Sequence, residues 1–326
     1  MADKIALISG IAGQDGAYLA DFLLRKNYRV IGLCRRATRE ALWRLDHFGI
    51  QNQVEILECD VRDYPRVEDI LKKTQPHEYY NLAALSSVTG VWERPLEAFQ
   101  TNCDAVVNML ESARRYSGET RIFQASSGKI YEQEKLETLR VTEDQSEFKP
   151  IDLYSVTKLA AHFSVINFRE QYGLFAVNGI LFQHESPLRP DTFVFKKIIK
   201  GVADLKKGNK KYLELGNLNV SRDWGFAGDY VRAMWMMLQA KKPEDFIISS
   251  GEQHTLRELL KVAFEALGIK DWEAYVRVNS DFIRKRDTSE LGASNERIAV
   301  SLGWKPEYSF LSLIERMIAY EMEQRA

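Results

Sequence analysis

A tyrosine and a lysine four residues apart are the side chains of this sequence best suited to acid–base chemistry. Tyr154 and Lys158 lie in the stretch YSVTK, at the expected start of a helix, and this spacing places both on one helix face. A phenol with a pKa of about 10 is a poor base at neutral pH. A nearby ammonium group lowers that pKa. The pair could then take a proton from a substrate hydroxyl while hydride leaves the same carbon.

Two residues upstream bear on the same chemistry. Ser127 ends the apolar stretch RIFQASS and could hold the same hydroxyl. Lys129 follows it in QASSGKIYEQ. A neutral lysine is a base, a charged lysine can only donate, and a lysine that points away does neither. The Y-x-x-x-K spacing alone is common, so its significance depends on a nucleotide-binding turn upstream.

Such a turn follows the first apolar run. The stretch SGIAGQDG spaces Gly10, Gly13 and Gly16 as G-x-x-G-x-x-G. The first glycine allows a tight turn, the second lets backbone approach a pyrophosphate, and the third lets the helix pack closely on the strand. The helix N-terminus then offers free N–H groups. A plain strand–helix turn is the alternative, but the position in an alternating chain favours a dinucleotide.

The residues after the second and third apolar runs bear on which dinucleotide binds. Arg35 and Arg36 stand where an NAD site carries an acidic residue. Two arginines suit a 2′-phosphate and predict NADP, with NAD less favoured. A surface basic pair is the alternative. Asp60 either accepts a hydrogen bond from the adenine amine or is an ordinary loop aspartate.

Alternating elements must position these residues. Buried strands are expected at 4–10, 29–34, 54–60, 78–84 and 121–127. Helical patterns lie between them, as in the long apolar-periodic segment 95–116. This alternation predicts an α/β fold, a Rossmann-type doubly wound parallel sheet with helices on both faces.

Beyond Pro150 the alternation loosens. A strand is expected at 174–182, and helices at 155–172, about 193–207, from the capping box Thr255-x-x-Glu258, and from about 311. No linker or repeat separates the regularly alternating part of the chain from the part beyond Pro150. We therefore expect a smaller, discontinuous C-terminal lobe.

Composition excludes several classes of function. The 326 residues carry a formal net charge of -1, which predicts neither nucleic-acid nor membrane binding. The first residues lack the features of a secretory signal, and no apolar run approaches the roughly 20 residues that span a bilayer. Three scattered cysteines predict reduced thiols and a cytoplasmic location. Five histidines without paired spacing predict no metal site.

Several stretches together resemble a known family. The glycine turn, NLAALSSV, QASSGKIY and YSVTK resemble the extended short-chain dehydrogenase/reductases, and within them the GDP-mannose 4,6-dehydratases. NGILFQHESP, SRDWGFAGDYVRAMWMMLQ and LGWKPE extend the likeness over nearly the whole chain. The resemblance implies an NADP-binding domain at 1–176 with a returning segment at about 215–250. It also implies a lobe mainly at 177–326 that binds a GDP-sugar, and a homodimer or homotetramer.

The resemblance also implies site residues. The catalytic group is Ser127, Lys129, Tyr154 and Lys158. The cofactor contacts are Gly10, Gly13, Gln14, Asp15, Gly16, Arg35, Arg36, Asp60, Val61, Leu82, Ala83, His184 and Arg189. The substrate contacts are Ser87, Asn178, Thr192, Val194, Lys197, Arg222 and Arg284. The two arginines of this last group suit a diphosphate.

One position departs from the family pattern. The dehydratases read Thr-Ser-Glu where this chain reads Ser127-Gly128-Lys129. Such enzymes oxidise C4 to a ketone, a base removes the C5 proton while an acid protonates the departing C6 hydroxyl, and hydride returns to C6. The glutamate serves the elimination. The substitution therefore leaves C4 oxidation intact and threatens elimination.

Three functions remain open. Chain-wide likeness favours an NADP-dependent 4,6-dehydratase of a GDP-mannose-like sugar, with Lys129 in place of the glutamate. The departure at Lys129 favours a C4 oxidoreductase or epimerase without elimination. A nucleotide-sensing protein without turnover is the third, and the intact Ser127, Tyr154 and Lys158 argue against it.

Overall fold

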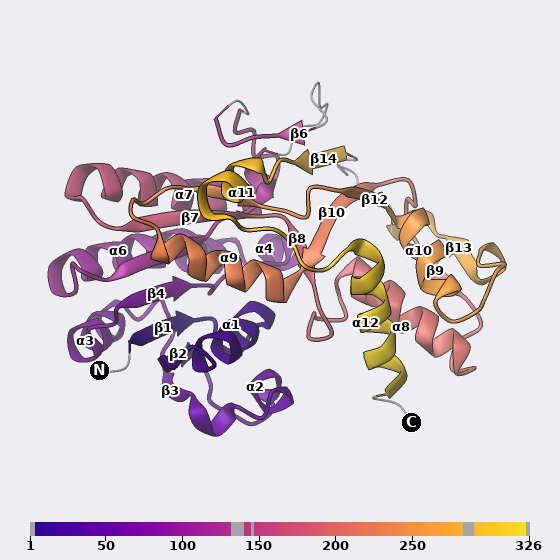
Figure 1. Ribbon diagram of the computed structural model, residues 1–326, viewed down its shortest axis with the longest axis horizontal. Helices are drawn as coiled ribbons and strands as arrows, with labels where there is room; N and C mark the ends of the chain where they lie inside the picture. Colours follow the sequence, from indigo (N-terminus) through magenta and orange to yellow (C-terminus); the bar gives the residue numbers. More distant parts are fainter. Residues whose placement is uncertain (1–3, 132–139, 145–146, 283–289, 324–326) are drawn as a thin grey trace.

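A seven-stranded sheet forms the larger part of the molecule (Figure 1). The computed structural model describes residues 4–131, 140–144, 147–282 and 290–323. The strand order is β11-β7-β5-β4-β1-β2-β3, and all neighbours pair in parallel. The strands are β1 (Ile5–Ser9), β2 (Arg29–Cys34), β3 (Glu55–Glu58), β4 (Glu78–Asn81), β5 (Arg121–Ala125), β7 (Ala176–Leu181) and β11 (Phe246–Ile248).

Strand β1 shows why this sheet is covered on both faces. Leu7 points into a core with α3 (Tyr64–Thr74), α6 (Ala105–Tyr116) and α7 (Leu153–Tyr172). Its neighbours Ala6 and Ile8 point into a second core with α1 (Gln14–Leu24) and α9 (Ala227–Gln239). Successive strand side chains alternate between faces, so a strand apolar throughout is buried on both. The predicted doubly wound fold is confirmed.

The order of the strands fixes where a ligand crevice lies. The chain runs outward from β1 through β2 to β3 and then returns to pair β4 with the other side of β1. The direction of winding therefore reverses between β1 and β4. In open parallel sheets, ligands bind outside the carboxyl ends of the strands at this point.

The segment 95–116, expected as one helix, contains a wider turn. It divides into α5 (Pro95–Phe99), the π-helical turn η2 (Gln100–Asp104) and α6. Within η2, Asn102 is buried. Its side chain accepts from the Leu85 backbone at 2.8 Å and donates to the Thr157 hydroxyl at 3.1 Å. The turn thus joins the loop after β4 to the helix that carries Tyr154.

The seven-stranded sheet and its covering helices form a first layer, and a second group of strands and helices, here called the second layer, lies beside it, mostly on the right of Figure 1. Strand β10 (Ser221–Phe226) pairs with β8 (Gln183–Glu185), β12 (Gln253–Thr255) and β14 (Glu290–Ala293), and β14 pairs with β6 (Arg140–Val141). Helices α8 (Val194–Lys206), α10 (Leu256–Glu265) and α12 (Phe310–Glu323) contact one another, and β9 (Leu213–Leu215) pairs with β13 (Val276–Val278). The short helices are α2 (Trp43–His47), α4 (Val88–Glu93), α11 (Glu296–Leu302), η1 (Gln51–Gln53), η3 (Gly128–Tyr131), η4 (Glu273–Tyr275) and η5 (Ser280–Phe282).

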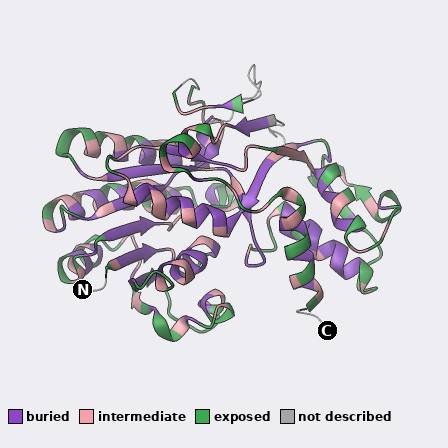
Figure 2. Cartoon of the chain, in the orientation of Figure 1, coloured by how far each residue is buried: buried purple, intermediate pink, exposed green. Residues whose placement is uncertain are grey.

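The chain crosses between the two layers more often than expected. Within 215–250, α9 and β11 lie with the seven-stranded sheet, whereas β10 lies in the second sheet. Strand β6, from the first half of the chain, also joins the second sheet. One apolar core extends through both layers, where Trp224 stacks on Phe310 with ring centres 6.1 Å apart. Figure 2 shows this buried interior. In the part of the chain that the structure describes, no helix could cross a membrane.

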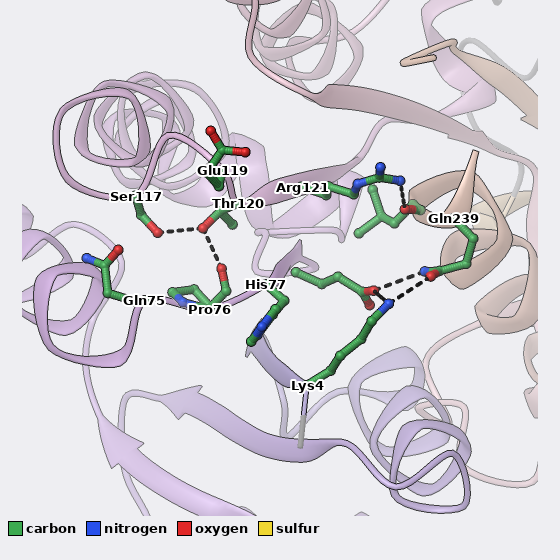
Figure 3. A pocket seen from close by; sticks show the side chains of 11 residues that line it. Lys4, Gln75, Pro76, His77, Ser117, Glu119, Thr120, Arg121 and Gln239 are labelled. Atoms are coloured by element: carbon green, nitrogen blue, oxygen red, sulfur yellow. Dashed lines mark hydrogen bonds and ion pairs between the residues drawn. The ribbon is translucent and has the colours of Figure 1, made fainter. Parts of the chain in front are cut away.

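A cavity of about 540 Å³ lies at the amino ends of the strands (Figure 3). Lys4, His77 and Thr120 directly precede β1, β4 and β5 and line it. Its polar side chains bond to one another or to backbone, as Gln239 does to the Glu78 carboxylate at 3.0 Å. This cavity is therefore at the opposite end of the strands from the crevice.

Candidate active site

The three glycines form a turn in which Gly10 and Gly16 leave no space for a side chain. Gly10 has φ of 79°, and a Cβ there would lie 2.8 Å from the Ala83 nitrogen. A Cβ at Gly16 would lie 2.4 Å from the Gly10 carbonyl oxygen. Gly13 is the N-cap of α1, and no side chain caps the helix there. The turn thus packs backbone against Leu82 and Ala83 and leaves helix N–H groups for a pyrophosphate, as a dinucleotide requires.

Gln14 and Asp15 join this turn to the second sheet. The Asp15 Oδ2 lies 2.9 Å from Nε2 of His184 in β8, and the Gln14 amide donates to the His184 carbonyl at 3.2 Å. Burial raises the pKa of Asp15, but the charge and hydrogen bond of His184 outweigh it and lower the pKa to about 2. Ser186 donates to the Gln14 oxygen at 2.7 Å. These polar side chains therefore hold α1 against β8.

The two arginines expected at the cofactor lie in a wider charged group. Arg35 Nη1 lies 3.2 Å from Glu97 Oε1. Arg62 binds both oxygens of Asp60, at 3.0 and 2.6 Å, and lies 3.7 Å from the same Glu97 oxygen. Arg36 is exposed. The hydrogen bond from Arg62 lowers the pKa of Asp60. A cavity of about 460 Å³ lined by Asp60 and Arg62 adjoins this group.

Sequence reasoning missed two members of that group. Arg62 stands two residues after Asp60, beside Val61, so its proximity was visible in the sequence. Glu97 comes from α5, far from the other members along the chain, and no local pattern indicates it.

Ser127, Tyr154 and Lys158 lie together at the carboxyl end of β5. Lys158 is 3% exposed, donates to the Ala125 carbonyl at 2.9 Å, and lies 5.9 Å from the centre of the Tyr154 ring. Tyr154 and Ser127 are each 9% exposed and hydrogen-bond to each other. The tyrosine and the lysine come from one face of α7, as their spacing predicts.

The expected lowering of the tyrosine pKa does not occur in this structure. Burial raises the pKa of Tyr154 to about 12, although the Ser127 hydrogen bond and the Arg189 charge lower it. Burial also lowers the pKa of Lys158 from 10.5 to about 8, so its ammonium is still the main form near neutral pH but by a much smaller margin than in water. Desolvation is the largest cause of both shifts. The phenol therefore holds its proton until positive charge is added nearby.

Lys129 lies at the edge of this group in an ion pair. Its Nζ is 3.2 Å from Oδ2 of Asp152, and its backbone N–H donates to the Ser127 hydroxyl at 3.3 Å. In this pair Lys129 is the hydrogen-bond donor and the carboxylate the acceptor. At Gly128 a Cβ would lie 2.7 Å from the Phe182 ring. The backbone at Gly128 is therefore packed closely against Phe182.

Arg189 lies between the glycine turn and the catalytic group. Its charge lowers the pKa of both Asp15 and Tyr154. Its Nε lies 3.4 Å from Oε2 of the buried Glu185, and burial raises the pKa of that carboxyl. Glu185 was not predicted, although it adjoins His184 in HES.

Most of the expected substrate residues lie around the second layer. Thr192, Val194 and Lys197 are exposed at the start of α8, and Arg222 lies in β10. Ser87 caps α4 and accepts from Gly90 at 3.3 Å. Arg284 lies outside the described residues.

Asn178 does not join them. Its side chain is fully buried within β7, donates to the His162 carbonyl at 3.1 Å and lies 3.3 Å from Asp245 Oδ2. The sheet interior holds this amide, and its role toward a substrate stays a prediction.

The sheet, the glycine turn and the serine–tyrosine–lysine group define the extended short-chain dehydrogenase/reductases. The family model described as GDP-mannose 4,6 dehydratase matches residues 7–317. The chain belongs to the GDP-mannose 4,6-dehydratase family. The predicted family and the prediction of an enzyme are confirmed.

Individual relatives give the same picture. GDP-mannose 4,6 dehydratase 2 of Arabidopsis thaliana is 39% identical over 330 residues, covering 98% of this chain and 87% of that protein. The dTDP-glucose 4,6-dehydratase of Bacillus anthracis, solved with NAD, is 18% identical with a TM-score of 0.85, covering 99% and 97% of the two chains. RMD from Pseudomonas aeruginosa, solved with NADPH, is 20% identical with a TM-score of 0.80, covering 98% and 99%.

Proposed function

We propose that this protein transfers hydride at C4 of a GDP-mannose-like sugar with NADP, and that the net reaction is 4,6-dehydration. The observation that carries this is the grouping of Ser127, Tyr154 and Lys158 beside the glycine turn, in a chain matched by the dehydratase model over residues 7–317. The alternating elements bring these residues to the winding reversal, where α/β enzymes bind ligands.

The residues present fit a nicotinamide dinucleotide. The turn at Gly10 and Gly16 has space for backbone only, and α1 presents uncapped N–H groups. Arg35, Arg36 and Arg62 would meet a 2′-phosphate, which supports NADP over NAD. Bound there, the oxidised cofactor supplies a hydride acceptor and a positive charge.

The chain's own residues handle the proton. Ser127 is placed to hold the C4 hydroxyl through its hydrogen bond with Tyr154. Tyr154 takes the hydroxyl proton as the C4–H bond gives up hydride, once positive charge has lowered its raised pKa. Lys158 adds positive charge when protonated, and its pKa of about 8 places that change within the working range of pH. Burial of all three excludes water from the proton path.

A second function is favoured by one observation. Lys129, in an ion pair with Asp152 at 3.2 Å, stands where the dehydratases carry a carboxylate. An ammonium cannot remove the C5 proton. In that case the enzyme either oxidises C4 and returns the hydride to it, as an epimerase does, or uses a reduced nicotinamide to reduce a 4-keto sugar made elsewhere.

Mass spectrometry separates the two functions. The protein is incubated with NADP and GDP-mannose in D₂O. Loss of water with deuterium in the product establishes dehydration. An epimer or a 4-keto sugar without loss of water establishes the second function. No change in any GDP-sugar overturns both. The same incubations with NAD test the cofactor preference.

We also propose a homo-oligomer in the cytoplasm. Three free thiols, at Cys34, Cys59 and Cys103, support a reducing compartment. Exposed apolar side chains on the helices around α7 support an oligomer.

A further inference from the structure

One carboxylate at the start of the catalytic helix makes two different interactions. Asp152 is the N-cap of α7: its Oδ1 accepts from the Ser155 backbone at 2.7 Å, and its own N–H donates to the Ser155 hydroxyl at 3.1 Å. Its Oδ2 accepts from Lys129 Nζ at 3.2 Å. The two side chains are mostly shielded, with 15% and 22% of their surface exposed. Asp152 thereby connects the turn after β5 to the helix that carries Tyr154.

The cap alone does not require a charge. Asparagine and serine cap helices as well as aspartate does, because only a side-chain oxygen is needed. The charge of Asp152 therefore has its main consequence at the second oxygen, where it meets the lysine. Lys129 is also tied to the catalytic group through its backbone N–H, which donates to the Ser127 hydroxyl at 3.3 Å.

We propose that Asp152 is a positioning residue that holds the Lys129 side chain in place at the start of the helix that carries Tyr154. During C4 oxidation, the step that both proposed functions share, Lys129 then serves the sugar as a hydrogen-bond donor. The inference rests on the proposed function, because it assigns the sugar to the same group of residues. It separates two tasks that one side chain performs, a cap for α7 and a counter-ion for Lys129.

Four variants separate the tasks. Asp152→Asn keeps the cap and removes the charge, whereas Asp152→Ala removes both. Lys129→Gln removes the ammonium, and the double variant Lys129→Gln/Asp152→Asn completes a double-mutant cycle. Lys149→Gln is the matched control, because this nearby lysine pairs with Glu147 on the surface. The readouts are Tm, NADP affinity, and kcat and KM for the transient reduced nicotinamide in a single turnover with GDP-mannose.

We expect Asp152→Asn to keep the wild-type Tm and NADP affinity while kcat/KM for C4 oxidation falls about tenfold, the effect of one charge-assisted hydrogen bond. We expect Lys129→Gln to lower kcat/KM by the same factor. The double variant should lower it no further, because Asp152 acts through Lys129. Asp152→Ala should lower Tm as well as kcat/KM. Lys149→Gln changes none of these values.

Two outcomes would overturn the inference. If Asp152→Asn keeps wild-type kcat/KM while Asp152→Ala loses activity in step with Tm, the residue is only a cap. If the losses of the double variant multiply, the two residues act independently. If the wild type forms no reduced nicotinamide with any GDP-sugar, the proposed function fails, and the catalytic part of the inference fails with it. A double-mutant cycle of the free energy of unfolding, measured in urea on the same proteins, then still tests the ion pair between Lys129 and Asp152. A coupling energy of zero would exclude it.

Discussion

At the scale of single residues, Tyr154 is the group whose proton the chemistry needs. Burial and the Ser127 hydrogen bond fix the phenol in place. We expect Tyr154→Phe to lower the rate of C4 oxidation about a hundred- to ten-thousand-fold, the range of a lost acid–base group. Fluorescence titration should give wild-type NADP affinity. Appreciable oxidation by this variant would show that another group takes the proton.

The lowered pKa of the buried Lys158 leads to a prediction about how stability depends on pH. Burial lowers its pKa from 10.5 to about 8. Between these values the unfolded chain carries a proton that the folded chain has released, so stability rises with pH. This contribution is complete above pH 10.5 and is lost as the pH falls through about 8. From about pH 7 to about pH 10, we expect the free energy of unfolding of Lys158→Met to rise less than that of the wild type, by about 2–3 kcal/mol. Urea unfolding at both values measures the difference, and equal rises would contradict the assigned pKa.

The residues predictable from sequence are those tied to a local pattern. The Y-x-x-x-K spacing lies on one helix face and the glycine spacing on one turn, so Tyr154, Lys158 and Gly10 come together as expected. The raised pKa of Tyr154 was not predictable, because it depends on burial by distant elements. The contact of Lys129 with Asp152 likewise spans 23 residues of the chain.

At the scale of elements, the turn from β1 to α1 depends on close backbone contact. A Cβ on Gly16 would lie 2.4 Å from the Gly10 oxygen and 2.6 Å from the Ile11 Cα, and backbone cannot easily move aside. We expect Gly16→Ala to weaken NADP binding at least about tenfold and to cost about 1–3 kcal/mol of stability. Calorimetric titration and urea unfolding measure both. Gly118→Ala is the control, since its Cβ would have no neighbour within 3.9 Å.

Long elements were predictable and short ones were not. Strands β1 to β5 lie within the short, mainly apolar stretches where strands were expected, and helix α10 carries its capping box as expected. Strands β8, β11 and β12 have three residues each, too few for a periodic signal. The π-helical turn η2 keeps the apolar period of the segment around it, and its cause is the contact of Asn102 with another helix. Contacts with distant segments, such as the pairing of β11 with β7 and of β12 with β10, form these elements, not local preference.

At the scale of the whole molecule, one set of helices presents apolar side chains to solvent. Helices α4, α5 and α6 each contact α7. On them Trp92 is 64%, Leu96 80% and Phe163 43% exposed. Helix α7 also carries Tyr154 and Lys158 on its buried side. A second copy of the chain that covered these helices would bury the exposed side chains and hold the catalytic helix in place.

We therefore expect the wild type to be a dimer or a larger homo-oligomer, and Phe163→Glu with Leu96→Glu to shift it to monomers at the same concentration. Two charges buried in an apolar interface without partners weaken association by far more than tenfold. Size-exclusion chromatography with light scattering gives the mass in solution. Val300→Glu is the matched control, because Val300 is 80% exposed on α11, which belongs to none of these helices. A monomeric wild type, or an oligomer unaffected by the double variant, would place the interface elsewhere or remove it. If the monomers also lose C4 oxidation while keeping their Tm, the neighbouring copy supports the helix on which the chemistry depends.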